Sequence, residues 1–322
     1  MIGLAKKTVY PAGIDLSSDY LKVAQLGVKD KGVYLNAAVI ESRPEEIKFG
    51  SGDWQRWVVD TAKKIFPRGG FSGKGVVASI PSEDIFVDRI RVKCRPDDAG
   101  LQKAAFKIIA NKLPFDSSGA MINYVVAGSS DNGRETDVVV IAAEREIVDR
   151  QLAIYEKAGL EIRGISVWPL AMITSYVKFF GKRQVDADVV SMLIDVEVNH
   201  SKIVIARDAD ILFARMIPFG SRHLSSDGTS AKFVLEAEAC CRYFESFSRS
   251  QQVARLVFFT GSSVDEAICG EVSKLAERLQ IPAQIGDVVA AVDAGCSSDI
   301  SVDRQGRQID WSIAFGLSLS SL

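Results

Sequence analysis

Short apolar runs separated by polar turns near the start of the chain predict an antiparallel three-stranded meander. The runs are residues 12–15, 21–28 and 33–41, and the polar turn Lys29–Gly32 separates the second from the third. Apolar residues then recur at helical spacing from Trp54 to Ile65, and a continuous apolar run follows. We therefore expect three strands, one helix and a buried strand.

The same order of elements recurs late in the chain. Each copy has an aspartate at the end of its first strand, Asp15 and Asp195, and the distance from that aspartate to the next turn is nearly equal in the two copies. An internal duplication explains this pattern. The second copy is predicted as strands at 191–196, 202–207 and 211–218, a helix at about 229–250 and a strand at 255–260.

The segment between the copies predicts a small α+β unit with three strands and two helices. The chain is thus divided into a first subdomain, an inserted subdomain and a second subdomain. The expected bounds are 1–82 for the first, completed by about 163–185 and the C-terminal helix, 83–162 for the insert, and 186–322 for the second.

Composition narrows the function classes. The chain has 322 residues, of which 47% are hydrophobic, enough for two buried cores, and its formal net charge is -2 with no long basic run. Nucleic acid is therefore not an expected partner. No apolar run approaches the ~20 residues that span a bilayer, so we expect no transmembrane segment.

The five cysteines form no CxxC pair and have no zinc-ligand spacing to His200 or His223. We expect no metal site, and we interpret the cysteines as reduced core thiols in a cytoplasmic protein. They are Cys94, Cys240, Cys241, Cys269 and Cys296.

The duplication with an aspartate after each first strand resembles the superfamily of actin, sugar kinases and heat-shock ATPases. More narrowly, the run Gly13–Lys22 resembles the first phosphate motif of the PilM family of type IV pilus assembly proteins. Other runs resemble PilM in the same order, at residues 2–7, 139–161, 217–224 and 313–317. The resemblance implies an α/β, duplicated actin-like (ribonuclease H-like) fold with an inserted α+β subdomain, as in the cell-division relative FtsA.

The resemblance also implies a partner. PilM proteins bind the short cytoplasmic N-terminal tail of the membrane protein PilN in a groove between the insert and the first subdomain. We therefore expect a cytoplasmic scaffold, peripheral to the inner membrane through its partner, with other pilus or secretion assembly proteins as further partners. The resemblance does not fix which side chains line the groove.

A nucleotide site is implied by the superfamily, but its motifs depart from the pattern. Ser17 takes the place of a glycine in the first phosphate turn, which is a mild change, whereas Glu197 takes the glycine position of the second turn. A carboxylate at that position would repel a polyphosphate. The residues that match a vestigial nucleotide site are Asp15, Ser17, Ser18, Lys22, Asp195, Glu197, Gly261 and Ser262.

Two further departures concern hydrolysis. Trp168 stands where the family has an acid before a proline, and an indole neither binds magnesium nor accepts a proton. The stretch between 220–222 and 243–244 is shorter than in a typical PilM, which trims the lid of the second half. We assign no catalytic residue and expect neither hydrolysis nor an ATP/Mg cofactor, while weak nucleotide binding stays open.

Two alternatives stay open. One is a relative of the cytoplasmic half of the type II secretion protein GspL, which an apolar segment of ~20 residues downstream of Leu322 would favour. The other is an active actin-like ATPase, favoured only by Asp15 and Lys22. In the simplest interpretation, Asp15 and Asp195 only cap turns, Lys22 is a surface lysine, and the histidines are solvated or hydrogen-bonded.

Overall fold

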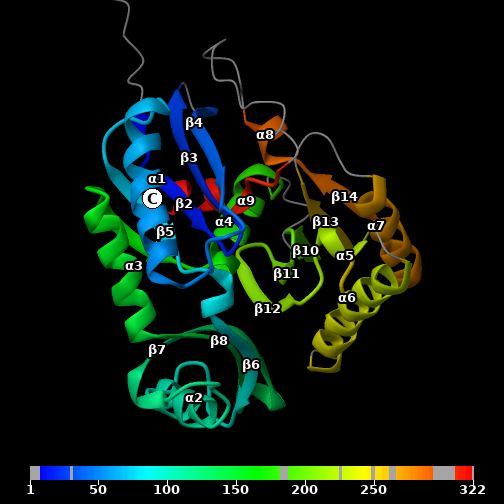
Figure 1. Cartoon of the computed structure of the whole chain (residues 1–322). Coiled ribbons are helices and arrows are strands. Elements are labelled where there is room, and N and C mark those ends of the chain that lie inside the picture. The colour runs from blue at the N-terminus through cyan, green and yellow to red at the C-terminus, as the bar shows by residue number, and fades with distance from the viewer. Residues whose placement is uncertain are drawn as a thin grey trace, which may run out of the picture.

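The chain folds into two similar α/β halves, with a smaller unit projecting from the first (Figure 1). This is a computed structural model, and it describes residues 8–29, 32–181, 188–224, 227–247, 251–260, 266–292 and 309–320. Some sequence expectations fall outside these ranges: the run 2–7, Gly261, Ser262 and Cys296.

The strands of the first-half sheet have the order β4-β3-β2-β5-β9, and β1 also pairs with β3. β2 pairs antiparallel with β3 and parallel with β5, so the predicted meander continues into a parallel strand. β2 is buried along its whole length, as expected of a central strand. The strands are β1 (Thr8–Val9), β2 (Ala12–Leu16), β3 (Tyr20–Lys29), β4 (Gly32–Ser42), β5 (Gly75–Ser79) and β9 (Glu161–Ser166).

The outer face of this sheet is covered by α1 (Gly52–Arg68) and α3 (Arg145–Lys157). α1 begins at Ser51, whose side chain accepts a hydrogen bond from the Trp54 backbone, and it buries Trp54 against the sheet. The sequence predicts α3 as a helix of the insert, but the structure packs it against the first half. Its residues Ile154 and Tyr155 pack in the core of the first half.

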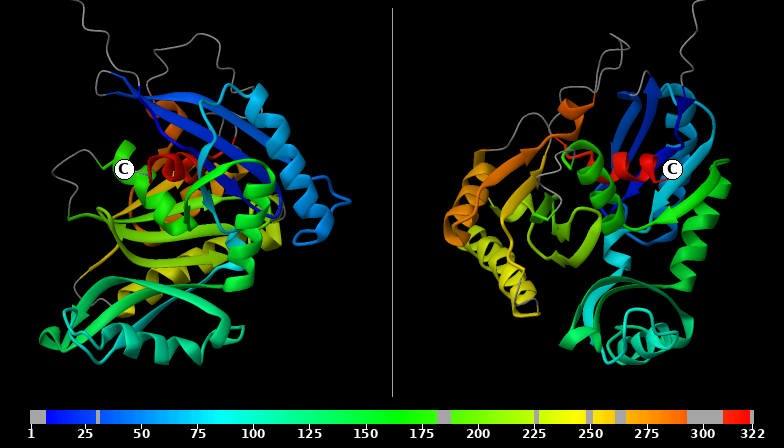
Figure 2. Two further views of the ribbon diagram at one scale, coloured as in Figure 1. Left: turned by 90° about the vertical axis from the view of Figure 1, so that its left-hand side faces the viewer. Right: turned by 180° about the vertical axis from the view of Figure 1, so that it is seen from behind.

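The second half repeats the strand order, as β12-β11-β10-β13-β14. β10 again pairs antiparallel with its hairpin partner and parallel with the strand after the helix, as β2 does. α6 and α7 cover the face of this sheet that points away from the first half (Figure 2). The elements are β10 (Val190–Val196), β11 (Ser201–Arg207), β12 (Asp210–Ile217), α5 (Ser221–Leu224), α6 (Asp227–Phe247), β13 (Arg255–Phe259), α7 (Glu266–Leu279) and β14 (Ala283–Gly286).

Three helices lie between the two sheets: α4 (Trp168–Phe179), α8 (Val288–Ala291) and α9 (Ser312–Leu319). Glycines let α9 approach its neighbours closely. A Cβ at Gly316 would lie 1.9 Å from the Ala171 carbonyl oxygen of α4, and one at Gly13 would lie 2.0 Å from the Ala314 oxygen. The C-terminal helix therefore completes the first half and joins the core shared by both sheets.

The insert is a three-stranded sheet, in the order β6-β8-β7, with one helix packed on it. It also contacts the second half. Arg91 on β6 donates a hydrogen bond of 3.0 Å to the carbonyl oxygen of Phe247, the last residue of α6. The elements of the insert are η1 (Ser82–Asp84), β6 (Phe86–Val92), α2 (Leu101–Ala110), η2 (Ser117–Gly119), β7 (Ala120–Ser130), η3 (Asp131–Gly133) and β8 (Glu135–Glu144).

None of the helices within the described ranges combines the length and the apolar character needed to cross a bilayer.

Candidate functional site

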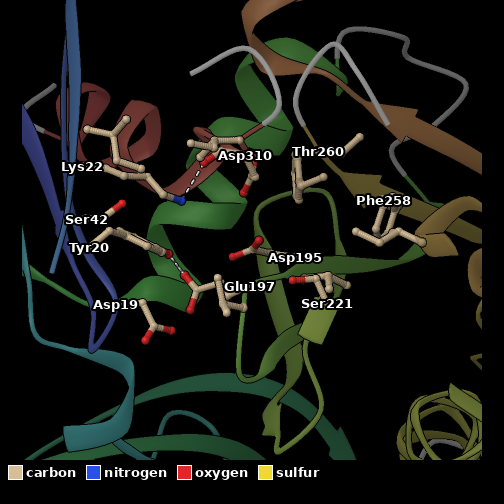
Figure 3. A pocket seen from close by; sticks show the side chains of 16 residues that line it. Asp19, Tyr20, Lys22, Ser42, Asp195, Glu197, Ser221, Phe258, Thr260 and Asp310 are labelled. Carbon is tan, nitrogen blue, oxygen red and sulfur yellow. Dashed lines mark hydrogen bonds between the residues drawn. The ribbon is translucent and has the colours of Figure 1, made fainter. Parts of the chain in front are cut away.

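Two hairpins with the same charge pattern meet in the cleft between the halves (Figure 3). In the first hairpin Asp15 lies opposite Lys22, with Lys22 Nζ 3.6 Å from Asp15 Oδ2. In the second, Asp195 lies opposite Lys202, with Lys202 Nζ 3.8 Å from Asp195 Oδ2. All four side chains are buried, and each aspartate forms an ion pair with the lysine of its own hairpin.

These positions correct the simplest interpretation of three residues. Lys22 is not a surface lysine, because it is 3% exposed and its Nζ also donates to the Asp310 carbonyl oxygen at 2.7 Å. Asp15 and Asp195 lie within β2 and β10, each facing a lysine, rather than in turns. Both aspartates therefore belong to the buried ion pairs of the two hairpins.

The Glu197 side chain points into the cleft, where its carboxylate contacts three polar groups. Lys202 Nζ lies 2.6 Å from Glu197 Oε1, and His200 Nε2 lies 2.5 Å from Oε2. The Tyr20 hydroxyl on β3, in the other half of the molecule, donates a hydrogen bond to Oε1 (Figure 3). The carboxylate is thus bound by groups of both halves.

A second contact joins the two hairpin turns. The side-chain amide of Asn199 donates to both carboxylate oxygens of Asp19, over 2.9 and 2.7 Å. Each turn is closed in the same way, because Ser17 N donates to the Tyr20 oxygen and Glu197 N donates to the His200 oxygen. The two turns are therefore equivalent in backbone structure and touch each other directly.

The beginning of the insert contributes a further carboxylate. Glu83 Oε1, in η1, accepts a hydrogen bond of 3.3 Å from Ser18 N and lies 3.9 Å from His200 Nδ1. Ser17 Oγ accepts from the backbone N–H groups of residues 19 and 20. The backbone donors of the first turn, from residue 17 to residue 20, therefore all have acceptors within the chain.

Burial and charge act in opposite directions on the pKa values of the hairpin residues. Burial raises the pKa of Glu197, but the Lys202 ammonium and His200 outweigh it and lower that pKa to about 2. Burial lowers the pKa of His200, but the bond to Glu197 outweighs it and raises the pKa. Glu197 is therefore ionised, and the imidazolium form of His200 is favoured.

A cavity of about 500 Å³ lies beside the hairpins. Among its described lining residues four carry carboxyl groups, and Lys22 provides the one ammonium group. Burial and the neighbouring Asp195 raise the pKa of Asp310 to about 8, against the effect of Lys22. The lining residues are Asp19, Tyr20, Lys22, Ile40, Ser42, Asp195, Val196, Glu197, Val198, Ser221, Phe258, Phe259, Thr260, Ile268, Ile309 and Asp310.

The charged groups of the cleft are paired with one another, Lys22 with Asp15 and Lys202 with Glu197. The phosphate side of the cleft already holds the Glu197 carboxylate, its cations are already paired, and the lining is acidic. Within the described ranges no group of three or more His, Cys, Asp and Glu side chains is spaced to hold a metal ion. Trp168, at the start of α4, is 1% exposed and packed in the central core, so its ring fills that position with hydrocarbon.

Sequence reasoning found the two aspartates, Lys22, Ser17, Ser18 and Glu197, and the structure brings these six together. It missed Tyr20, Glu83, Asn199, His200 and Lys202 as partners. Lys202 could have been found from the duplication, because its separation from Lys22 equals that of Asp195 from Asp15. Nothing in the sequence pattern indicates the contact of Glu83.

Two sheets of identical strand order, with paired hairpins in the cleft between them, define a protein of the actin-like class. The chain belongs to the family of the type IV pilus assembly protein PilM, whose family model matches residues 13–238.

Solved structures agree with this fold. The chain resembles a structure described as a PilM-PilN type IV pilus biogenesis complex, with a TM-score of 0.72 and 16% identity over 97% of this chain and 98% of that one. Two more distant likenesses have TM-scores of 0.47. They are the ethanolamine utilization protein EutJ of Carboxydothermus hydrogenoformans, 11% identical over 96% of this chain and 89% of that one, and the cytoplasmic domain of EpsL of Vibrio cholerae, 9% identical over 85% and 95%.

Proposed function

We propose that this chain is a scaffold of a type IV pilus assembly complex that binds the N-terminal cytoplasmic tail of a PilN-like membrane protein and does not hydrolyse ATP. Membership of the PilM family supports the assembly role, and the likeness to a PilM-PilN complex supports the partner. The tail would hold the chain at the inner face of the membrane. The observation that carries the proposal is an apolar groove between the insert and the first half.

The groove has a volume of about 570 Å³. Its walls are β7 and β8 of the insert on one side, and the end of β9 with the start of α4 on the other. Met121 and Leu170 line it and are 41% and 39% exposed, and Arg145 is its one charged residue among those described. The lining residues are Ile80, Ile85, Phe106, Ala120, Met121, Ile122, Asn123, Tyr124, Val125, Ile141, Ala142, Ala143, Arg145, Val148, Ile165, Ser166, Val167 and Leu170.

Two strand edges border this groove. β7 is the last strand of the insert sheet, and β9 is the last strand of the first-half sheet, as far as the structure describes them. An extended peptide can add main-chain hydrogen bonds to an outer strand while its alternate side chains enter apolar pockets. The groove therefore suits a short, extended, apolar tail.

The cleft argues against hydrolysis. Hydrolysis would require a carboxylate that orients water and a site that accepts the phosphates. Trp168 stands at the family's acid position, and the Glu197 carboxylate is bound between the hairpins. The type II secretion alternative stays a prediction, because the likeness to EpsL is too distant to support it.

Peptide binding tests the proposed partner. A fluorescein-labelled peptide with the sequence of the cytoplasmic tail of the PilN-like protein from the same genome is titrated with the full chain, and anisotropy is recorded. We expect saturable binding by the wild type. Met121→Asp should weaken it at least tenfold, about 1.4 kcal/mol, because it puts a charge into an apolar groove.

Val126→Asp is the matched control. Val126 lies on the same strand and is 43% exposed, but it does not line the groove. The affinity of Val126→Asp for the peptide should stay within twofold of the wild-type value. Failure of the wild type to bind, or equal losses in the two variants, would refute the groove as the tail site.

Phosphate release tests the second part of the proposal. The wild-type chain incubated with millimolar ATP and magnesium should release phosphate no faster than the buffer. Release that grows with protein concentration and disappears in Asp195→Asn would contradict the proposal and restore the ATPase alternative.

A further inference from the structure

Glu197 lies between the two hairpins, and the family resemblance assigns its position to the second phosphate turn. Its carboxylate accepts hydrogen bonds from the Lys202 ammonium group and the Tyr20 hydroxyl group and forms an ion pair with the His200 imidazole. We propose that Glu197 is an internal substitute for the phosphate anion, which holds the two halves closed without a nucleotide.

The charge of Lys202 requires such an anion. Its side chain is 0% exposed, and a buried ammonium without a close counter-ion is very unfavourable. Asp195 lies 3.8 Å from its Nζ, whereas Glu197 lies 2.6 Å away and makes a hydrogen bond. Glu197 is therefore the close counter-ion, and its removal would leave a site for another anion.

Glu197 differs from the two aspartates in where its partners come from. Asp15 and Asp195 face lysines of their own hairpins. Glu197 also accepts from the Tyr20 hydroxyl, 177 residues away in the first half. The charge that neutralises Lys202 thus connects the halves at the same time.

The backbone holds this side chain in position. Ser221 N donates to the Glu197 carbonyl oxygen at 2.7 Å, and Arg222 N donates to the Val198 oxygen at 3.1 Å. Gly220 packs against the turn so closely that a Cβ there would lie 2.4 Å from the Glu197 oxygen. The segment that follows β12 therefore packs against the turn that carries Glu197 and holds this turn in position.

The cleft cavity beside Glu197 shares no lining residue with the peptide groove. A loss of tail binding would therefore not bear on the role of Glu197, which is measured without peptide.

Chemical rescue tests the proposal directly. Thermal unfolding is measured for the wild type, Glu197→Gly and Glu197→Gln, in sodium phosphate and in sodium chloride of equal ionic strength. We expect Glu197→Gly to unfold at a lower temperature and to recover by about 3 °C or more in ~50 mM phosphate relative to chloride, because phosphate enters the vacated space. Glu197→Gln should be destabilised and not rescued, since its amide fills the space without a charge.

Phosphate stabilises many proteins by exclusion from their surface, so a control is needed. Val58→Ala truncates a fully buried side chain of α1 and creates no anion site. Its response to phosphate should equal that of the wild type. A Glu197→Gly variant that folds but gains no more from phosphate than Val58→Ala does would overturn the proposal.

Hydrogen exchange of the wild type decides the question if Glu197→Gly does not fold. The amides of residues 17–20 and 197–200 should be protected without nucleotide, and ~5 mM Mg-ATP should leave their exchange unchanged. Slower exchange of both turns on addition of Mg-ATP would show that the cleft still closes on an external anion, which contradicts the internal substitute.

Discussion

Asn199 donates hydrogen bonds to both carboxylate oxygens of Asp19, and the two residues are 180 positions apart in the chain. The same separation relates Asp15 to Asp195 and Lys22 to Lys202. Asp19 and Asn199 are thus equivalent positions of the two copies, and they contact each other across the cleft. The duplication places the two turns face to face, and the difference between aspartate and asparagine makes this pair attractive.

Replacing Asn199 should weaken the closed arrangement. Asn199→Ala removes two hydrogen bonds to a carboxylate that is mostly buried, and we expect it to lower the free energy of unfolding by about 1–2 kcal/mol. Urea unfolding followed by tryptophan fluorescence measures the change.

Asn111→Ala provides the comparison, because Asn111 is exposed at the end of α2. It should change the free energy of unfolding by no more than ~0.5 kcal/mol. Equal effects of the two variants would mean that the contact between the turns contributes nothing measurable.

Asp310 should make stability fall as the pH rises. Burial and Asp195 raise its pKa in the folded state to about 8, from a usual 3.8. The folded state therefore retains the proton that the unfolded chain loses, so the contribution is full below pH 3.8 and is lost as the pH rises through 8. One pKa unit corresponds to about 1.4 kcal/mol, and we expect a loss of ~2 kcal/mol between pH 6 and pH 8.

Asp310→Asn isolates this contribution. An amide cannot ionise, and it can still accept from Ser312 N as the carboxyl group does at 2.9 Å. Relative to the wild type, the variant should therefore gain stability from pH 6 to pH 8 in urea titrations, and the difference should level off by pH 9. A difference that stays constant over this range would show that Asp310 does not titrate there. The raised pKa of His200 affects both proteins alike and cancels in the comparison.

The adjacent cysteines of α6 should be unreactive in the native protein. Burial raises the pKa of Cys240 and of Cys241 to about 12, so little thiolate is present at neutral pH. After brief treatment with iodoacetamide, peptide mass spectrometry should find both unlabelled until urea is added. Cys269, which is only half-buried, should be labelled first. Labelling of Cys240 as fast as Cys269 would mean that α6 opens readily.

Periodicity and duplication were sufficient to predict most of the fold. The apolar runs gave the strands of both meanders to within a few residues, and equal spacing after Asp15 and Asp195 indicated two equivalent sheets. Packing partners were harder to predict. The apolar stripe of α3 shows that the helix covers a sheet but not which one, so it was assigned to the neighbouring insert instead of the first half.

The site shows the same limit. The identity of Glu197 was enough to predict a conflict with phosphate, because a carboxylate is charged in any orientation. Its role depends on Tyr20, which lies 177 residues away in the other half of the molecule. Contacts between distant segments depend on three-dimensional geometry, which one sequence does not contain.

Arg89 and Arg91 of the insert contact the end of α6 in the second half. We expect this contact to influence peptide binding in the groove. Arg91 makes two hydrogen bonds to Asp137, at 2.7 and 3.1 Å, and donates to the carbonyl oxygen of Phe247. Arg89 pairs with the same aspartate, 2.9 Å away, and lies over the Phe247 ring. The end of α6 thus has its carbonyl bound by a cation, which also stabilises the helix terminus.

Arg91→Ala should lower the free energy of unfolding by about 1–3 kcal/mol and speed amide exchange in the last turn of α6. It should also weaken tail binding by ~2–5-fold although Arg91 does not line the groove, because the insert would be held less firmly against the rest of the molecule. Arg95→Ala is the control, because the Arg95 side chain is 74% exposed and its partner Asp97 is exposed as well. The free energy of unfolding and the affinity for the tail should therefore stay unchanged. If Arg91→Ala loses stability but keeps full affinity for the tail, the contact with α6 supports the fold without shaping the groove.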